Sequence, residues 1–361
     1  MNGSLDSVNT PALLLDLDIF EANLSKMHAG VAYAGRRIRP HAKAHKCPRI
    51  ARRQMEAGAC GICVATLPEL ELMLAAGVED VLLCSPIASP AKAQSIAALA
   101  AAHPYIKVVV DHIDQVDLYQ QAARLTGRPL HVLVDLDTGD HRTGAPCGEP
   151  AVRLAEAVDE MSHLSFAGLQ AFSGSAAHTE GAGERREKSR TLLAAAVETR
   201  LELLRKGLNA ETLTGGSTGT WNIDTALDGF TELQAGSYVF MDAMYSRIGG
   251  VDFGHALTVL ATVVSANHPG RITVDAGFKA FSTDRPFGPE PIGIENAKWQ
   301  WAGDEFGFLF AEKLPALGSR IRFIPPHCDP TVNLYDRIHV VQKDNVVDIW
   351  PLKRVSLPNS L

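Results

Sequence analysis

Residues 81–110 read VLLCSPIASPAKAQSIAALAAAHPYIKVVV. Two apolar runs, Val81–Cys84 and Ile106–Val110, enclose an alanine-rich segment, Ser89–Ala102, that has the composition of a helix. That segment begins with a serine, which suits the N-cap, and a proline, which suits the first helical turn. Because both runs are apolar apart from Lys107, we expect two parallel strands, each buried on both faces and joined by a helix.

The same alternation of apolar runs and helix-like stretches continues from about residue 15 to about residue 245. Predicted helices include Asp18–Ala34, Leu67–Ala76 and Gly181–Lys206. Eight βα units over ~230 residues are typical of a (β/α)8 TIM barrel, an α/β fold. A doubly wound sheet, which needs fewer strands, is the alternative. The eight predicted strands are Ile38–Ala42, Gly61–Ala65, Val81–Cys84, Ile106–Val110, Val132–Asp137, Phe166–Phe172, Thr212–Gly216 and Glu232–Val239.

After about residue 246 the character of the sequence changes. Alternating runs separated by Gly, Pro and Asn turns replace the alanine-rich helices, which predicts an antiparallel β domain. We therefore expect a barrel over residues 15–245 and a β domain over residues 246–361, to which about residues 1–14 also belong. The segment that starts at Thr10 and Pro11 could add a strand to either part. The alternating runs are Leu257–Ser265, Arg271–Asp275, Arg320–Ile324 and His339–Gln342.

Composition excludes several classes of protein. The 361 residues carry 34 Lys and Arg against 41 Asp and Glu, a net charge of −7. With no basic run, nucleic acid and anionic membranes are not expected as partners. No apolar stretch reaches ~18 residues and no secretory signal is visible, so we expect no membrane span. Six cysteines in this length favour a reduced, cytoplasmic chain, and Cys60 and Cys63 are interpreted as packed strand thiols rather than a redox pair.

The residues after the first predicted strand are unusually basic. Residues 39–46 read RPHAKAHK, and strand alternation would place His41, Lys43 and His45 on one face. A lysine that points into a barrel mouth needs a partner or a covalent role, because desolvation and nearby cations lower its pKa and favour Schiff-base chemistry. A solvated basic loop is the alternative.

Glycine-rich loops follow the last two predicted strands. Residues 214–220 read TGGSTGT and residues 234–238 read QAGSY. Glycines allow the backbone to approach a phosphate, and successive N–H groups with hydroxyls form an anion site. Barrels commonly bind phosphate in these two positions, which favours phosphate binding over simple turns.

Three further places could carry chemistry. The late segment 325–333 reads PPHCDPTVN, and in an extended segment His327 and Asp329 would face one side while Cys328 faces the other. An imidazole and a carboxylate suit Mn²⁺, Mg²⁺ or Zn²⁺, although a polar turn is the alternative. Arg142 could bind a cofactor or carboxylate, or only a nearby aspartate. His178 follows the sixth strand and could equally be a surface residue.

These motifs together resemble those of the fold-type III, alanine-racemase-like pyridoxal-phosphate enzymes, and more closely the D-threonine aldolase and D-serine dehydratase family. The resemblance extends from Thr10 to Trp350. It is carried by RPHAKAHKCP at 39–48, TGGSTG at 214–219, ELQAGSY at 232–238 with FMD at 240–242, and HCDPTVN at 327–333.

The resemblance implies a role for each candidate residue. Lys43 would be the lysine that forms a Schiff base with pyridoxal 5'-phosphate, and Arg142 would lie near the cofactor ring. His327 and Asp329 would bind the divalent metal, and His178 would act on the substrate hydroxyl as the second catalytic residue. The phosphate would be held by Gly215, Gly216, Ser217, Thr218, Gly219, Ser237 and Tyr238.

The implied reaction is metal-dependent retro-aldol cleavage of D-β-hydroxy-α-amino acids, with D-threonine giving glycine and acetaldehyde, in a homodimer. Dehydratases of the family carry His-x-Cys, which favours zinc, whereas His-x-Asp here favours an aldolase with Mn²⁺ or Mg²⁺. A D-serine or 3-hydroxy-D-aspartate lyase, a racemase and a non-catalytic cofactor carrier are the alternatives. Two departures from known aldolases, the sequence FSGS at 172–175 and Phe306, leave the substrate side chain least constrained.

Overall fold

The computed structural model describes residues 3–352, and internal contacts divide this part of the chain into two compact units. We call residues 27–43 and 48–236 the barrel unit, and residues 3–26, 44–47 and 237–352 the sheet unit. The predicted fold class, an α/β barrel with a separate, largely antiparallel sheet, is confirmed. The chain leaves the barrel unit directly after Lys43 and returns to it at Pro48.

Eight strands of the barrel unit pair in parallel, and each lies within or next to a predicted strand. A short strand, β8 (Ala145–Pro146), adds to β7. The eight are β3 (Arg37–Ile38), β4 (Ile62–Val64), β5 (Val81–Leu83), β6 (Lys107–Val110), β7 (Leu130–Asp137), β9 (Leu164–Ala171), β10 (Leu213–Gly215) and β11 (Glu232–Leu233).

The strand order closes on itself. The sheet runs β3-β11-β10-β9-β7-β6-β5-β4, and a parallel bridge between His41 and Cys63 joins the two ends. Two backbone hydrogen bonds support this closure, from Cys60 N–H to the Ile38 carbonyl at 2.9 Å and from Cys63 N–H to the Pro40 carbonyl at 2.8 Å. Because all eight strands run the same way, their carboxyl ends meet at one end of the barrel.

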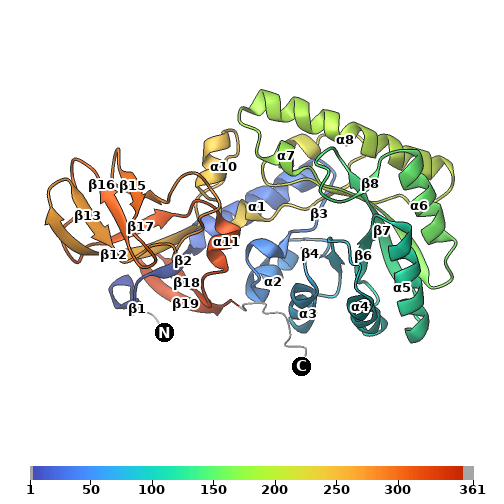
Figure 1. Ribbon diagram of the computed structural model, residues 1–361, viewed down its shortest axis with the longest axis horizontal. Coiled ribbons are helices and arrows are strands. Elements are labelled where there is room, and N and C mark those ends of the chain that lie inside the picture. Colours follow the sequence, from blue (N-terminus) through green and yellow to red (C-terminus); the bar gives the residue numbers. More distant parts are fainter. Residues whose placement is uncertain (1–2, 353–361) are drawn as a thin grey trace. The chain divides into compact units, whose positions relative to one another are not determined.

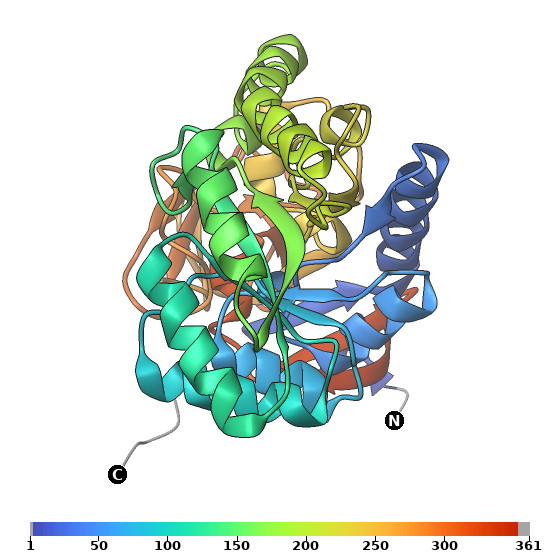
Figure 2. The ribbon, with the colours of Figure 1, turned by 90° about the vertical axis from the view of Figure 1, so that its right-hand side faces the viewer.

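Helices cover the outside of these strands, as Figure 1 and Figure 2 show for α3 to α6. The predicted cap of α4 is confirmed, since the Ser89 hydroxyl accepts from Lys92 N–H and Pro90 opens the helix. The helices are α2 (Pro48–Glu56), α3 (Leu67–Ala75), α4 (Pro90–Ala102), α5 (Ile113–Thr126), α6 (Glu149–Asp159), α7 (Gly174–Ala177), α8 (Ala182–Arg205) and α9 (Trp221–Asp224).

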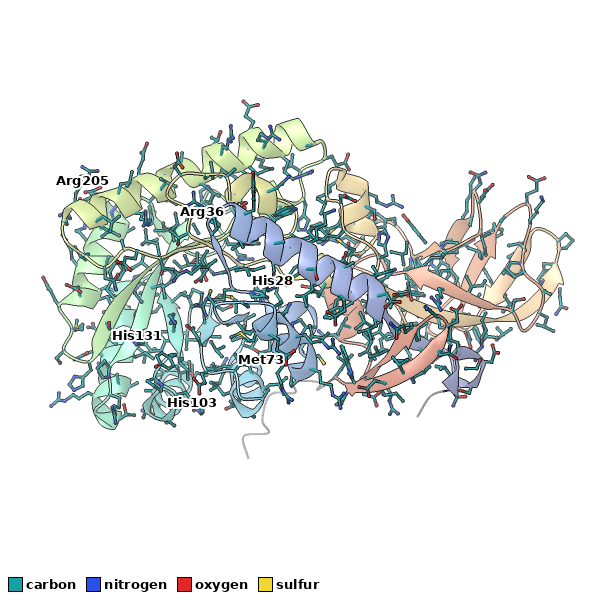
Figure 3. The ribbon with its side chains drawn as sticks, turned by 180° about the vertical axis from the view of Figure 1, so that it is seen from behind. His28, Arg36, Met73, His103, His131 and Arg205 are labelled. Atoms are coloured by element: carbon teal, nitrogen blue, oxygen red, sulfur yellow. The ribbon has the colours of Figure 1, made fainter. Side chains whose placement is uncertain are left out.

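Helix α1 (Leu17–Tyr33) precedes the first barrel strand, and its second half belongs to the barrel unit. In that half, His28 Nδ1 lies 3.0 Å from the Ala57 carbonyl. Just beyond the helix end, the Arg36 guanidinium donates to the carbonyls of Thr225 and Leu227 at 3.1 and 3.0 Å (Figure 3). These bonds hold the chain where it enters β3.

Two predicted strands end earlier than expected. After β3, residues 42–44 form a 3-10 turn, η2 (Ala42–Ala44), so the predicted alternation of side chains from residue 41 to residue 45 is wrong. Pro40 has no N–H for a strand ladder, which explains why the strand does not continue. After β11, residues 237–239 form a second 3-10 turn, η3 (Ser237–Val239), instead of the predicted strand.

The sheet unit holds a ten-stranded sheet in which every pair is antiparallel except β2 with β18. The N-terminal strand β2 (Ala12–Asp16) lies between β18 and β12, which settles the part to which this segment belongs. The path is β1 (Gly3–Ser4), β19 (Asn345–Pro351), β18 (Arg337–Gln342), β2, β12 (Leu257–His268), β13 (Arg271–Val274), β16 (Gly307–Phe310) and β15 (Lys298–Trp301), with β17 (Arg320–Ile324) pairing β12 and β14 (Glu290–Pro291).

Two short helices of the sheet unit lie next to the segment 325–327. Helix α10 (Ala243–Ile248) starts where Ala243 N–H and Met244 N–H donate to the carbonyls of Pro325 and Pro326. Helix α11 (Cys328–Val332) follows directly, with His327 at its N-cap position.

Candidate active site

Most predicted cofactor residues of the barrel unit follow the carboxyl ends of its strands. Lys43 comes after β3, Arg142 after β7, His178 after β9, and the loop 215–219 after β10. In a parallel barrel these ends lie together, which is the position of active sites in this architecture. The topology therefore brings the barrel-unit candidates to one end.

Phe172 brings two of the candidates together. The Lys43 Nζ lies 5.8 Å from the centre of the Phe172 ring, and the Arg142 Cζ lies 4.9 Å from the same ring. A ring face attracts cations at this range. Lys43 is half-buried and Arg142 is exposed. Phe172 is one of the two departures noted in the sequence, so the departure lies beside the predicted cofactor lysine.

His41, whose ring contacts the Lys43 backbone, forms a cluster with two thiols, Cys63 and Cys84. The His41 Nε2 is 3.3 Å from the Cys84 Sγ, and the Lys43 N–H donates to the His41 Nδ1 at 3.4 Å. A hydrogen bond from Cys63 and the charges of His41 and Lys43 lower the pKa of Cys84, against the effect of burial. Burial raises the pKa of Cys63 well above its usual value. Cys60 instead donates to Glu232 at 3.1 Å and lies before β4, so of the two predicted strand thiols only Cys63 is in a strand.

The glycine-rich loop fits a phosphate. Gly216 has φ +72°, and a Cβ on Gly219 would meet the Ala177 carbonyl at 2.0 Å, so both positions need glycine. Within residues 3–352, the N–H groups of Gly216 and Ser217 have no protein acceptor. Two successive free N–H groups beside a left-handed glycine form the kind of backbone concavity that binds anions. Thr218 is buried in the same loop.

The buried carboxylate of Asp224 anchors this loop through hydrogen bonds. The Thr220 hydroxyl and the Ser189 hydroxyl each donate to Asp224 at 2.5 Å, and Thr220 lies 3.1 Å from the Ser217 hydroxyl. Ser217 in turn accepts from Gly219 N–H at 3.1 Å. Burial raises the pKa of Asp224 to about 6, although the two hydroxyls oppose the shift. The sequence analysis missed Asp224 because it lies in a short helix after the loop, outside the motif.

The sheet unit holds the predicted metal pair. His327 caps α11 and Asp329 lies in its first turn, so the segment is helical and the premise of an extended segment is wrong. Cys328 does not point away, since its Sγ lies 3.2 Å from the Asp329 Oδ1. Asp242 fixes this start, because it accepts from Cys328 N–H at 2.8 Å and from Tyr245 N–H at 2.9 Å.

His327 is oriented by a residue that the sequence analysis missed. Its Nδ1 lies 2.7 Å from the Asp284 Oδ2, and the Arg285 Nη2 is 3.4 Å from the same nitrogen. Within the described chain the Nε2 has no protein partner, so it is available as a ligand atom. A carboxylate behind a histidine is the usual second layer of a metal site, and here the donor set suits a divalent ion. Asp284 and His327 are 43 positions apart in the sequence, so no local pattern could have revealed the pair.

The two residues predicted to complete the phosphate site lie in the sheet unit. The Ser237 hydroxyl donates to the Asp329 Oδ1 at 3.3 Å, so a phosphate role would require this hydroxyl to change partner. Tyr238 is fully buried, and its ring centre is 6.1 Å from that of Phe253. His178, at the end of α7, is exposed, as is Phe306.

The residues after Lys43 contact, within the sheet unit, the segment 327–333 that carries the predicted metal pair. The Lys46 Nζ donates to the Asn333 Oδ1 at 2.7 Å, and Asn333 is the last residue of the HCDPTVN motif. His45 is buried, with its ring centre 6.5 Å from that of Phe240. The segment that continues from the predicted cofactor lysine is therefore bonded to the segment that carries His327 and Asp329.

A closed parallel barrel with a lysine after its first strand, a phosphate-type loop after β10 and a separate sheet defines the alanine-racemase-like class of pyridoxal-phosphate enzymes. Comparison with known families agrees, since the alanine racemase N-terminal domain matches residues 15–244 and a putative serine dehydratase domain matches residues 256–341. The chain belongs to the D-threonine aldolase and D-serine dehydratase family within this class.

Individual relatives cover nearly the whole chain. D-threonine aldolase from Arthrobacter sp. is 39% identical over 355 residues, 96% of this chain and 93% of that protein. 3-hydroxy-D-aspartate aldolase from Paracoccus denitrificans (strain Pd 1222) is 33% identical over 96% of this chain and 92% of that protein. The crystal structure of D-threonine aldolase from Filomicrobium marinum superposes with a TM-score of 0.94 at 39% identity, over 98% of this chain and 97% of that one. The chain is therefore a lyase.

No helix within residues 3–352 is both long enough and apolar enough to span a bilayer.

Proposed function

We propose that this enzyme cleaves D-β-hydroxy-α-amino acids by a retro-aldol reaction that depends on pyridoxal 5'-phosphate and a divalent metal, with D-threonine giving glycine and acetaldehyde. The observation that carries the proposal is the donor set at α11, where His327 and Asp329 offer a nitrogen and an oxygen and Asp284 orients the histidine. A nitrogen and oxygen set favours Mn²⁺ or Mg²⁺, although Zn²⁺ also fits. The similarity to D-threonine aldolases supports the same reaction.

In this proposal the bound cofactor supplies an electron sink for the breaking Cα–Cβ bond, and the metal lowers the pKa of the substrate hydroxyl. Lys43 holds the cofactor through its ε-amine, and the loop 215–219 holds the phosphate with the free N–H groups of Gly216 and Ser217. Arg142 lies on the Phe172 ring beside Lys43 and so can bind the cofactor or the substrate carboxylate.

The chain must also remove the proton of the substrate hydroxyl. We assign this step to His178, whose exposed imidazole follows β9 at the end of the barrel where Lys43 also lies. A neutral imidazole accepts a proton near neutral pH, directly or through one water. His327 and Asp329 would hold the metal, and Asp284 would keep the Nε2 of His327 directed toward it.

Incubation of the protein with pyridoxal phosphate, Mn²⁺ and either D-threonine or D-serine, followed by product identification, tests the proposal. We expect glycine and acetaldehyde from D-threonine, loss of turnover with a chelator and recovery on adding Mn²⁺. L-threonine is the matched control and should not react. Formation of ammonia with pyruvate from D-serine, without glycine or aldehyde from D-threonine, would show a dehydratase instead.

A second candidate is cleavage of 3-hydroxy-D-aspartate to glycine and glyoxylate. It is favoured by Arg285, whose guanidinium lies 3.4 Å from the His327 Nδ1 and could pair with the second carboxylate of that substrate. The similarity to 3-hydroxy-D-aspartate aldolase supports it. Comparison of kcat/KM for the two substrates, in the wild type and in Arg285→Met, separates the candidates, because only the dicarboxylate should depend on Arg285.

Three further properties stay proposals. We propose a homodimer, as the family resemblance implies, and a cytoplasmic location, which the low cysteine content supports. We also propose a barrel domain over residues 15–245 and a β domain over 246–361 with about 1–14. The ranges of the two family matches support a boundary near residue 245. Internal contacts group residues 15–26, 44–47 and 237–245 with the sheet unit instead.

A further inference from the structure

The barrel unit contains a cluster of metal-binding side chains that the proposed reaction does not use. The ligand atoms of His41, Cys63 and Cys84 all lie within 4.8 Å of one another. We propose that these three residues form a second metal site, which binds a thiophilic divalent ion, Zn²⁺ above all. The inference does not depend on the proposed reaction or on the His327 and Asp329 pair.

Three consecutive strands of the barrel build this cluster. His41 follows β3 and forms the parallel bridge with Cys63 of β4, while Cys84 directly follows β5 and donates its N–H to the Val64 carbonyl at 2.9 Å. The positions of the three backbones are therefore set by the strand ladder and not by mobile loops. Cys63 and His41 are buried and Cys84 is half-buried.

The geometry is close to that of a bound zinc ion. In a tetrahedral site with zinc–sulfur and zinc–nitrogen bonds of usual length, the ligand atoms lie about 3.5–3.8 Å from one another. The His41 Nε2 and Cys84 Sγ are already 3.3 Å apart. The Cys63 Sγ lies 3.6 Å from the Gln234 Oε1, a weak contact that a metal can replace. Three protein ligands leave a fourth position open, as in catalytic zinc sites.

The chemistry of the ligands separates this site from the one at α11. Two thiolates and an imidazole select Zn²⁺ over Mn²⁺ and Mg²⁺, which prefer oxygen ligands. The Lys43 N–H now donates to the His41 Nδ1 at 3.4 Å. A metal on Nε2 places the ring proton on Nδ1 and ends this long contact, so occupancy of the site acts on the backbone of Lys43.

Titration of the full-length protein with Co²⁺ tests the proposal, since Co²⁺ reports thiolate ligands by charge-transfer absorption. We expect one such Co²⁺ per chain, displaced by Zn²⁺ and unaffected by excess Mg²⁺. The variants Cys63→Ser and Cys84→Ser should each weaken Co²⁺ binding by more than about 100-fold, because even second-layer changes cost up to that factor. Cys147→Ser, which alters a half-buried thiol of the same unit outside the cluster, is the matched control and should bind as the wild type does.

A second measurement needs no variant. Zn²⁺ should slow the alkylation of Cys84, the half-buried thiol of the cluster, in the wild-type protein, as mapped by mass spectrometry, and leave Cys147 unaffected. The proposal is overturned if Co²⁺ gives no thiolate band, if the band survives both serine variants, or if Zn²⁺ does not protect Cys84. Isolation of the protein with a Cys63–Cys84 disulfide that resists metal loading would also overturn it. Each outcome is read without substrate, so it stands apart from the assay of the proposed reaction.

Discussion

Replacement of Asp284 should weaken metal binding at His327 without changing the protein's ability to turn over once the metal is bound. The Asp284 Oδ2 lies 2.7 Å from the His327 Nδ1, and the Arg285 Nε is 3.4 Å from the same carboxylate oxygen. Although partial burial opposes ionisation, the hydrogen bond and charge of His327 and the charge of Arg285 lower the pKa of Asp284, so it is ionised at neutral pH. An ionised carboxylate fixes the ring proton on Nδ1 and makes Nε2 a better ligand.

The expected loss of metal affinity depends on how far the side chains of Asp284 and His327 are exposed to solvent. Removal of a carboxylate behind a metal-binding histidine weakens metal affinity by roughly 10- to 100-fold, or about 1.4–2.8 kcal/mol. The Asp284 side chain is 41% exposed and that of His327 is 18% exposed, so solvent screens part of the interaction. We therefore expect about tenfold for Asp284→Asn, which keeps an acceptor but loses the charge. Asp284→Ala, which loses both, should approach the upper end of the range.

The assay is the dependence of D-threonine cleavage on Mn²⁺ concentration. The Mn²⁺ concentration for half-maximal rate should rise in the order wild type, Asp284→Asn, Asp284→Ala, while kcat at saturating Mn²⁺ stays within about twofold. Asp304→Asn changes an exposed carboxylate of the same unit and should behave as the wild type. Equal Mn²⁺ dependence in all four proteins would refute the role of Asp284, and a fall in kcat alone would show that it acts on the substrate rather than on the metal.

Four other perturbations test the remaining parts of the structure. Lys43→Ala should abolish turnover and the absorption of bound pyridoxal phosphate. His178→Ala should keep that absorption and lower kcat by about 10²–10⁴. An unchanged kcat would exclude His178 as the base. Gly216→Ala should raise the Kd for pyridoxal phosphate and cost about 1–2 kcal/mol in thermal unfolding, because φ is +72° and the new Cβ would lie 2.7 Å from Asp224. Burial opposes ionisation of Glu232, but the adjacent Arg39 lowers its pKa from 4.5 to about 2. The ionised Glu232 therefore stabilises the fold above pH 4.5, and about 3 kcal/mol of the free energy of unfolding is lost as the pH falls from 4.5 through 2. Urea unfolding at stepped pH should show this loss in the wild type and not in Glu232→Gln, which should be less stable near neutral pH.

The barrel could be predicted from the sequence because its strands are buried on both faces and therefore appear as uninterrupted apolar runs. β4 and β5 show this, and the cap at Ser89 follows from local chemistry alone. The strand ends were less predictable. Residues 42–44 and 237–239 form 3-10 turns just beyond the last ladder bonds, which His41 and Gln234 donate, and these turns have no periodic signature.

The candidate site likewise has one part that the sequence predicted and one part that it did not. Motifs allowed Lys43, the loop 215–219 and the pair His327 and Asp329 to be predicted, since each lies within one short segment. The residues that orient them come from elsewhere in the chain, as Asp284 and Asp224 show, and nothing in their local sequence distinguishes them from surface acids. Long-range side-chain contacts of this kind depend on the folded structure, so an isolated sequence does not reveal them.

The basic octapeptide 39–46 is packed into the structure rather than forming the solvated basic loop that was the alternative. Arg39 is buried between Glu232 and Asp80, His41 contacts Cys84, and Lys46 donates to Asn333. Within residues 3–352 no hydrogen bond or ion pair engages the Lys43 amine, and it lies 5.8 Å from the centre of the Phe172 ring. The backbone before this lysine is held by the bridge from His41 to Cys63. A half-buried amine without an acceptor, next to an anchored strand end, is compatible with the predicted Schiff-base role.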